Sequence, residues 1–298
     1  MIPYFDAHCD TATECDSIEQ NHGQLDAKRL SAFSPSAQIF AICYTKDMSA
    51  RCAKRLPELK REIDASKTLK LCRCADDIRG AEKEGKTAAL IAIEGAEHFD
   101  CSLNGLRKAY ELGVRSVNIT WNYDNDLSGA AMASGAGLSS RGGEFVFAAQ
   151  ELGVILDMSH ISERAFWQVM ELSKKPVYAS HSDSAALCPA KRNLTDDQFS
   201  ALVKCGGGAG VNMYSDFIGL ENDVDSVIAH IEHFLSLGGE HAVFLGTDFD
   251  GIEASPAGIS GAEDMSTLYE ALLRRNYPEG LVRDIFYYNL LYILERAL

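Results

Sequence analysis

Residues 154–181 read VILDMSHISERAFWQVMELSKKPVYASH and contain one complete strand–helix–strand unit. Two near-continuous apolar runs, Val154–His160 and Val177–His181, are typical of parallel strands that are buried on both faces. Between them, Ser162–Leu172 has the apolar spacing of an amphipathic helix, and Ser162 stands in the N-cap position. A parallel strand, a helix and a second parallel strand form the repeating unit of α/β folds.

The same alternation continues over the rest of the chain. Eight β-rich runs are expected, at Pro3–His8, Gln38–Tyr44, Ala88–Glu94, Ser116–Thr120, Val154–His160, Val177–His181, Gly208–Tyr214 and Val243–Asp248. Helical patterns lie at Ala50–Ala65, Asp76–Glu84, Leu103–Leu112, Glu144–Leu152, Ser162–Leu172, Thr195–Lys204, Asp225–Leu237 and Leu281–Leu298. Because no linker or low-complexity segment divides residues 1–298, the sequence predicts a single (β/α)8 barrel domain of the TIM type. An open doubly wound sheet is the alternative, and no G-x-G-x-x-G motif after a strand supports it.

The composition excludes several kinds of partner. The 298 residues include 28 Lys and Arg against 43 Asp and Glu, which gives a net charge of −15. A nucleic-acid groove or an anionic membrane surface requires the opposite sign, so neither is expected as a partner. Nine scattered cysteines without a C-x-x-C pair argue against a zinc ribbon and fit a reducing compartment. Since no apolar run reaches the ~18 residues of a membrane span and no leader precedes the first motif, we expect a cytoplasmic protein.

Residues of the metal-binding types gather at the C-terminal ends of five predicted strands. They are His8, Asp10, Glu94, His160, His181 and Asp248. In a closed barrel these ends converge on one cavity, and the long loops after the strands, here 121–143, 182–194 and 249–262, lie on the same face. A lone histidine at a strand end is usually a hydrogen-bonded structural residue, but six such residues at one end predict a shared metal site. Imidazole and carboxylate ligands without thiolate suit zinc, manganese or iron.

At these positions the sequence resembles the membrane (renal) dipeptidase family, a branch of the amidohydrolase-like barrels. The similarity extends from Asp6 to about Asn289 and keeps the order of the family's motifs. These motifs are Asp6-Ala7-His8-Cys9-Asp10, Glu94-Gly95, Asp157-Met158-Ser159-His160, Ser180-His181-Ser182, Arg192-Asn193, Val211-Asn212-Met213-Tyr214, His230-Ile231-Glu232-His233 and Gly246-Thr247-Asp248-Phe249-Asp250-Gly251. Each motif alone is unspecific, whereas the ordered series is highly specific.

The resemblance implies a zinc-dependent dipeptidase with two Zn²⁺ per chain and a bridging hydroxide as the nucleophile. Carried over by position, His8 and Asp10 would hold one zinc ion, and His160 and His181 would hold the second. Glu94 would bridge both ions and so belong to the catalytic centre. The substrate would be a small dipeptide, and dipeptides with a D-residue at the C-terminal position are included. A homodimer is compatible with the family.

The resemblance also implies how the substrate is held. Asp248 would lie beside the nucleophilic water and the substrate amino group, where it can carry the proton to the leaving amine. Arg192 would bind the substrate carboxylate in the bidentate manner that suits a guanidinium. Tyr214 and the backbone of Gly251 would line the pocket. A closed pocket with a carboxylate clamp at one end favours dipeptides over longer peptides.

One segment departs from the family pattern. Better-known members carry a histidine after the fourth strand that helps to stabilise the tetrahedral intermediate, and Trp121 stands in its place here. An indole N–H can donate one hydrogen bond but cannot titrate. Asn122 and Asn125 are the candidates for the missing polar group, so Trp121 and Asn125 are counted among the expected substrate-binding residues.

Two other functions stay open at this point. The same ligand set could serve another amidohydrolase-type hydrolase of amides or lactones, although such relatives often use a carboxylated lysine where this chain has Glu94. A catalytically weakened metal-binding relative is the second alternative, and Trp121 is its only support. The remaining histidines have no matching role: His22, His98 and His241 are expected on the surface or in packing, and His230 and His233, at i,i+3 spacing rather than in an H-E-x-x-H motif, are expected to be structural.

Overall fold

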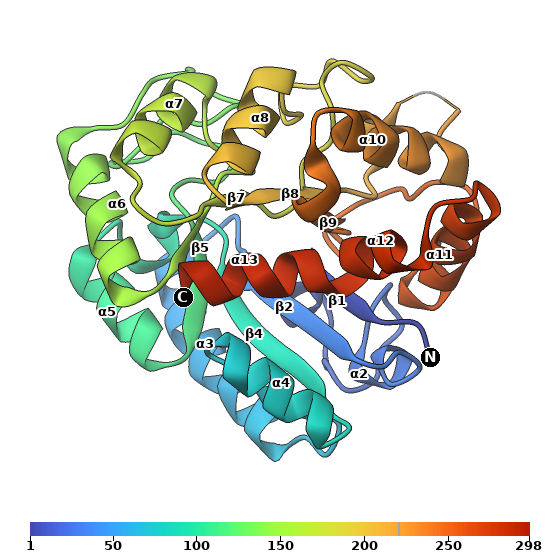
Figure 1. Cartoon of the computed structure of the whole chain (residues 1–298). Helices are drawn as coiled ribbons and strands as arrows, with labels where there is room; N and C mark the ends of the chain where they lie inside the picture. Colours follow the sequence, from blue (N-terminus) through green and yellow to red (C-terminus); the bar gives the residue numbers. More distant parts are fainter. Residues whose placement is uncertain (220) are drawn as a thin grey trace.

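The computed structural model describes residues 1–219 and 221–298, which build a closed barrel of parallel strands surrounded by helices (Figure 1). The ring consists of β1 (Tyr4–Cys9), β2 (Ser36–Ile42), β4 (Thr87–Ile93), β5 (Val114–Asn118), β6 (Ile155–Asp157), β7 (Tyr178–Ala179), β8 (Gly208–Val211) and β9 (Val243–Leu245). Each strand pairs in parallel with the next, and the pairings of β9 with β1 and of β2 with β4 close the ring. The predicted (β/α)8 barrel is therefore confirmed.

Helices cover the outside of the ring. The longer ones are α3 (Met48–Ala65), α4 (Ala75–Lys83), α5 (Leu103–Glu111), α6 (Ser140–Leu152), α7 (Glu163–Leu172), α8 (Asp196–Lys204), α10 (Val224–Ser236), α11 (Met265–Arg274) and α13 (Asn289–Ala297). Short helices are α1 (Thr11–Glu14), α2 (Ala27–Leu30), α9 (Ser215–Ile218) and α12 (Glu279–Arg283). The predicted N-cap at Ser162 is confirmed, because its side chain accepts a hydrogen bond from the Ala165 amide. Within the described residues, none of these helices has the length and apolar character that a membrane crossing requires.

Four elements differ from the sequence-based prediction. A ninth strand, β3 (Leu69–Leu71), pairs with the first half of β4. The second half of the same edge of β4 pairs with β5. The three residues of β3 are too few to show a period. Helix α6 begins at Ser140 rather than Glu144, because Ser139 caps a first turn whose glycines hide the helical pattern. Helix α11 was not expected, and the predicted C-terminal helix contains a π-helical turn at Asp284–Tyr288.

Large side chains fill the interior of the barrel. The Tyr178 hydroxyl of β7 is 2.7 Å from the Ser116 hydroxyl of β5, and the Tyr178 ring lies 6.0 Å from that of Phe244 on β9. In each pair one strand of the ring lies between the two strands, so both contacts span an intervening strand. The filled interior leaves the C-terminal ends of the strands as the place where polar residues can converge.

Candidate metal centre

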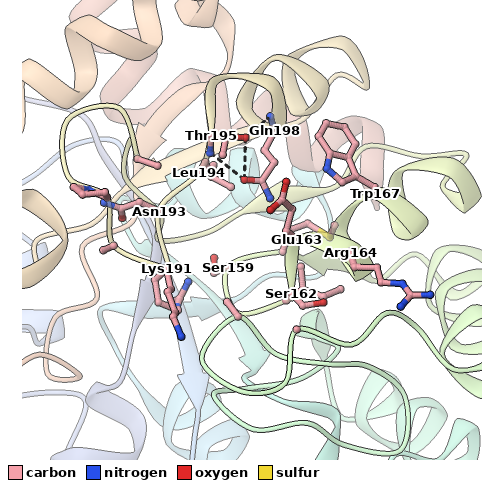
Figure 2. Close-up of a pocket in the computed structure, with 18 residues that line it drawn as sticks. Ser159, Ser162, Glu163, Arg164, Trp167, Lys191, Asn193, Leu194, Thr195 and Gln198 are labelled. Carbon is pink, nitrogen blue, oxygen red and sulfur yellow. Dashed lines mark hydrogen bonds between the residues drawn. The ribbon is translucent and has the colours of Figure 1, made fainter.

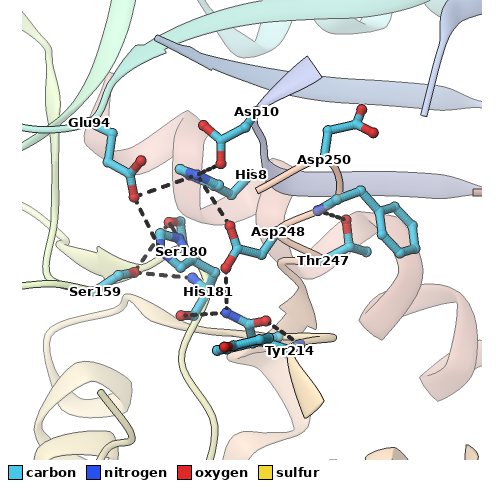
Figure 3. Close-up of polar contacts among 12 residues, drawn as sticks. His8, Asp10, Glu94, Ser159, Ser180, His181, Tyr214, Thr247, Asp248 and Asp250 are labelled. Atoms are coloured by element: carbon cyan, nitrogen blue, oxygen red, sulfur yellow. Dashed lines mark hydrogen bonds and ion pairs between the residues drawn. The ribbon is translucent and has the colours of Figure 1, made fainter. Parts of the chain in front are cut away.

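The structure brings the six predicted ligand-type residues together at the C-terminal end of the barrel. Figure 3 shows five of them: His8, Asp10, Glu94, His181 and Asp248. They come from five strand ends: His8 and Asp10 from β1, and Glu94, His160, His181 and Asp248 from the segments after β4, β6, β7 and β9. All but Asp248 are buried. Residues that are far apart in the sequence thus form one compact cluster, as the convergence of strand ends predicts.

Glu94 belongs to two groups of ligand atoms. In the first, His8 Nε2 lies 3.7 Å from Asp10 Oδ2 and 3.7 Å from Glu94 Oε1. In the second, Glu94 Oε1 lies 2.6 Å from His160 Nε2 and 3.4 Å from His181 Nε2. Within each group the ligand atoms lie within 4.8 Å of one another, close enough to hold a cation. A carboxylate common to both groups has the placement that a bridge between two cations requires.

The tautomer of His181 follows from its neighbours. Asp157 accepts hydrogen bonds from the Ser159 amide and hydroxyl and from the Ser180 amide and hydroxyl. The Ser180 hydroxyl therefore gives its proton to Asp157 and accepts one from His181 Nδ1, 2.6 Å away. Nε2 of His181 then carries the lone pair and faces Glu94. Asp157 also lies within reach of His8 and His181, but its four donors assign it to bracing the histidine.

His160 is oriented in the same way by a different residue. Its Nδ1 lies 2.9 Å from Asn122 Oδ1, which can only accept, so Nδ1 carries the proton and Nε2 the lone pair. Burial and the nearby Arg192 lower the pKa of His160 to about 3, so the imidazole is neutral. The Nε2 atoms of His160 and His181 are 3.0 Å apart and both face Glu94.

The donor set fits metal ions. Two imidazole lone pairs and a carboxylate oxygen converge in the second group, and acceptors this close repel one another unless a cation lies between them. In the first group, both ring nitrogens of His8 and Oδ1 of Asp10 are buried without a hydrogen-bond partner. Burial lowers the pKa of His8, but Glu94, Asp10 and Asp248 raise it to about 10, which shows how strongly this cluster attracts positive charge.

Asp248 and Gly251 lie in the turn after β9. Asp248 has a φ of 63°, a conformation rare for a non-glycine residue, and its Oδ2 accepts a hydrogen bond of 3.0 Å from Asn212 Nδ2. Its other oxygen, Oδ1, is 3.8 Å from His8 Nε2. A Cβ on Gly251 would lie 2.0 Å from Asp10 Oδ2, so a side chain here would occupy the position of that carboxylate. The sequence alone gave Asn212 no role.

A cavity of about 680 Å³ opens over the cluster. Besides Asp10, Glu94, His160, His181 and Asp248 of the cluster, its lining includes the predicted residues Arg192, Tyr214, Gly251 and Trp121, together with Asn122. Arg192 is buried, with Nη2 3.0 Å from His160 Nε2 and its guanidinium 5.6 Å from the Phe217 ring. Its Nη1 has no partner among the described residues. The structure therefore holds a positive charge, with a free donor, beside the proposed ligands.

Asn125 lies apart from this cavity. Its amide donates to Glu97 Oε2 and to the Ile119 carbonyl, each at 2.8 Å. Its Oδ1 accepts from the amides of Leu127 and Ser128. All the hydrogen-bonding groups of the side chain are used, by Glu97 after β4 and by residues 119–128, so Asn125 ties its loop to the segment after β4 and lies outside the cavity lining. An asparagine in a polar loop gives no sequence signal that separates these two roles.

A second cavity, of about 610 Å³, lies on the other side of Arg192, between α7 and α8 (Figure 2). Thr195 and Gln198, which line it, are bonded to each other in the capping box of α8. The metal-binding groups found among the described residues lie outside its lining. Thr195 and Gln198 thus serve the fold, and the cavity holds none of these metal-binding groups.

The other histidines agree with the structural reading. His98 accepts a hydrogen bond from the Tyr44 amide at Nε2 and its Nδ1 faces the Gly95 carbonyl, 2.9 Å away. His230 accepts from the Ser184 amide and its Nε2 lies 2.9 Å from the Ile218 carbonyl. His22 and His241 are exposed.

Comparison with known proteins connects this geometry to a family. Residues 1–297 match the family model described as membrane dipeptidase, peptidase family M19. An uncharacterized dipeptidase from Schizosaccharomyces pombe is 38% identical over 208 residues, which are 66% of this chain and 49% of that protein. An uncharacterized protein from Klebsiella pneumoniae is 33% identical over 243 residues, which are 77% of this chain and 89% of that protein. The chain thus spans about half the length of the first of these relatives.

Solved structures agree with the family match. A metallopeptidase from Rhodobacter sphaeroides, bound to a phosphinate mimic of the dipeptide L-Ala-D-Ala, superposes with a TM-score of 0.89 at 26% identity, covering 100% of this chain and 99% of that one. A metallopeptidase of family M19 described as dipeptidase AC gives 0.89 at 27% identity, covering 99% and 98%. The resemblance inferred from the ordered motifs and the predicted barrel are both confirmed.

Proposed function

Because the chain belongs to the membrane dipeptidase family of metallopeptidases, we propose that it is a dipeptidase that hydrolyses the peptide bond of dipeptides with two zinc ions. A hydrolase of peptide bonds is the enzyme class of the family, as the sequence predicted. The observation that carries the two-ion proposal is Glu94, whose carboxylate belongs to two groups of buried ligands at once.

We assign His8, Asp10 and Glu94 to one ion and Glu94, His160 and His181 to the other. Two such ions, when bound, lower the pKa of a shared water so that hydroxide exists at neutral pH, and they polarise the carbonyl of the substrate. The protein holds the imidazoles in the required tautomer through Asn122 and the Asp157–Ser180 pair.

Asp248 is the proposed proton carrier. The hydrogen bond from Asn212 occupies Oδ2, which leaves Oδ1 facing the cluster. We propose that Oδ1 accepts the proton of the attacking water and transfers it to the amine nitrogen as the peptide bond breaks. The left-handed backbone of Asp248 and the hydrogen bond from the Gly251 amide to its carbonyl fix the direction of this carboxylate.

Arg192 is the proposed clamp for the C-terminal carboxylate of the substrate. Its buried guanidinium, held near the Phe217 ring, keeps its charge because arginine does not lose its proton in proteins. A carboxylate fixed at Arg192 and an amine near Asp248 set the length of the substrate to two residues. The Rhodobacter relative is bound to a mimic of L-Ala-D-Ala, and we propose that this chain also accepts a D-residue in the second position.

Three further proposals rest on the sequence. We propose that residues 1–298 act as one domain, that the protein is cytoplasmic with no nucleic-acid or membrane partner, and that a homodimer is its candidate assembly. The nine cysteines are all unpaired, which supports a reducing compartment.

A direct assay tests the function. Zinc-loaded protein should hydrolyse L-Ala-L-Ala and L-Ala-D-Ala, lose this activity in chelator and regain it with zinc. Asp248→Asn should bind zinc as the wild type does and lower kcat by about 10²–10⁴-fold, the usual contribution of a general acid–base group. Asp76→Asn, which changes an exposed carboxylate on α4, is the matched control. Failure of zinc-loaded wild type to cleave any dipeptide would overturn the proposal.

A further inference from the structure

Two arginines line the cavity, and they come from opposite sides of the barrel. Arg192 lies in the segment after β7, whereas Arg51 lies in the first turn of α3, shortly after β2. In the closed ring, three strands separate β2 from β7 in either direction. A molecule held by Arg192 at one end and extended across the barrel mouth therefore points toward Arg51.

The guanidinium of Arg51 is positioned but unpaired. It lies 3.8 Å from the centre of the Tyr44 ring, a cation–π contact that limits its movement. Among residues 1–219 and 221–298, no carboxylate forms an ion pair with it. Arg55, one turn further along α3, shows the contrast, because it is paired with Glu62 and donates to the Ala12 carbonyl. The hydrogen-bond donors of Arg51 are thus available to a ligand.

The backbone of Tyr44 is tied to the segment that carries the proposed ligand Glu94. The Tyr44 amide donates a hydrogen bond of 2.8 Å to His98 Nε2, and His98 Nδ1 donates to the carbonyl of Gly95, the residue after Glu94. Burial lowers the pKa of His98, so the imidazole stays neutral and can accept and donate at the same time. A buried histidine therefore connects the Arg51–Tyr44 pair to the segment that carries Glu94.

Arg51 is a positive charge in a cavity lining that is otherwise mostly acidic. The other charged side chains that line the cavity outside the ligand cluster, Glu14, Asp216, Asp250 and Glu253, are acidic. A substrate side chain with a carboxylate is repelled by them and finds a positive charge only near Arg51, since Arg192 is committed to the terminal carboxylate. Conversely, a cationic side chain placed beside Arg51 is opposed by a like charge.

We propose that Arg51 and Tyr44 form the subsite for the side chain of the N-terminal residue, and that this subsite selects dipeptides whose first residue is acidic. The inference rests on the proposed function and deepens it. With the terminal carboxylate at Arg192 and the amine near Asp248, the first side chain is the part of the substrate left to cross toward β2. The Arg51 guanidinium then binds the side-chain carboxylate while its other face remains on Tyr44.

The test compares Glu-Ala, Gln-Ala and Lys-Ala as substrates of zinc-loaded wild type, Arg51→Gln and Arg51→Glu. Wild type should favour Glu-Ala over Gln-Ala in kcat/KM by about threefold to tenfold, between the values for an exposed ion pair and for a charged hydrogen bond. Arg51→Gln should bring this ratio close to one, and Arg51→Glu should favour Lys-Ala. Lys54→Gln removes the same charge from α3 outside the cavity and should keep the wild-type ratio.

Each ratio is measured on one protein sample, so partial misfolding of a variant cancels. A wild-type ratio near one, or a preference for Glu-Ala that persists in Arg51→Gln, would overturn the subsite while leaving the dipeptidase intact. If neither these dipeptides nor L-Ala-L-Ala nor L-Ala-D-Ala is hydrolysed, the proposed function itself fails and the subsite with it.

Discussion

Replacing Gly251 by alanine adds a single methyl group next to the proposed metal ligands. The Cβ introduced by Gly251→Ala would lie 2.0 Å from Asp10 Oδ2 and 3.0 Å from Asp248 Oδ1. Real Cβ atoms do not approach a heavy atom within 3.0 Å, so Asp10 must retreat by at least 1.0 Å. Gly251 does not need a left-handed backbone, so the variant reports on crowding at Asp10 and Asp248 rather than on backbone strain.

The expected cost follows from that displacement. A misplacement of about 1 Å in a catalytic constellation lowers the rate by about 10²-fold. Because Asp10 is a proposed ligand, the affinity for the ion it shares with His8 should fall as well, by at least the roughly 10–100-fold seen when a supporting residue is lost. Asp248 is pushed in the same substitution, so kcat should fall more than KM rises.

The assay is kcat and KM on L-Ala-D-Ala, with zinc affinity measured by competition with a chelator and folding followed by circular dichroism. Gly280→Ala is the matched control, because a Cβ there meets no atom within 4 Å and the residue lies in the short helix α12. It should leave all three properties unchanged. A Gly251→Ala protein with wild-type zinc affinity and kcat would refute the placement of Asp10 at the metal centre.

Four further outcomes are expected. Arg192→Ala should mainly raise KM, by about 10–150-fold for a lost charge-assisted contact. Dipeptides with an amidated C-terminus should be poor substrates of the wild type and no worse for the variant. Equal KM values of the wild type for free and amidated dipeptides would contradict the clamp. Asn122→Ala removes the hydrogen-bond partner of His160 Nδ1 and should weaken zinc binding by about 10–100-fold. Trp121→Phe should lower kcat by less than about tenfold, because the full effect of a single oxyanion donor is about 10²–10³-fold. If Trp121→Phe instead abolished kcat while Asn122→Ala kept its zinc affinity, the indole N–H would be the donor. Asn125→Ala should lower the melting temperature, because it removes the hydrogen bonds that hold the loop, and it should leave KM unchanged. A raised KM in folded Asn125→Ala protein would instead place Asn125 at the substrate. Burial lowers the pKa of His230, so the unfolded chain binds a proton that the folded chain excludes. The free energy of unfolding should therefore decrease as the pH falls below about 6.5. In urea unfolding at about pH 5 and pH 7, this decrease should be smaller for His230→Asn than for the wild type, and an equal decrease in both proteins would contradict the role of His230.

The barrel and the ligand cluster could be predicted from the sequence because their signals are local. Each strand is a short apolar run, and each proposed ligand stands at the C-terminal end of such a run, as His160 and His181 do in residues 154–181. Parallel strands in a closed ring then bring those ends together without any knowledge of the side-chain contacts. The strand β3 was missed because its three residues gain their structure only from pairing with β4.

The finer parts of the site depend on contacts between distant segments and left no local pattern. Asn122 and Asn125 are three residues apart and chemically identical, yet one faces His160 and the other braces its own loop. Arg51 looks like an ordinary surface residue of an amphipathic helix until the ring order places it across the cavity from Arg192. Roles of this kind become visible only when hydrogen-bond partners and burial are known.

The number of metal ions bound per chain separates a two-ion centre from a single-ion site, because Glu94 is proposed to serve two ions. Protein stripped with chelator, reloaded with zinc and freed of excess metal should contain two zinc ions per chain by elemental analysis. Glu94→Ala should lose the pair, while Glu97→Ala, which removes a nearby carboxylate outside both ligand groups, should keep it. One zinc ion or none in the wild type, or two in Glu94→Ala, would contradict the shared-carboxylate centre.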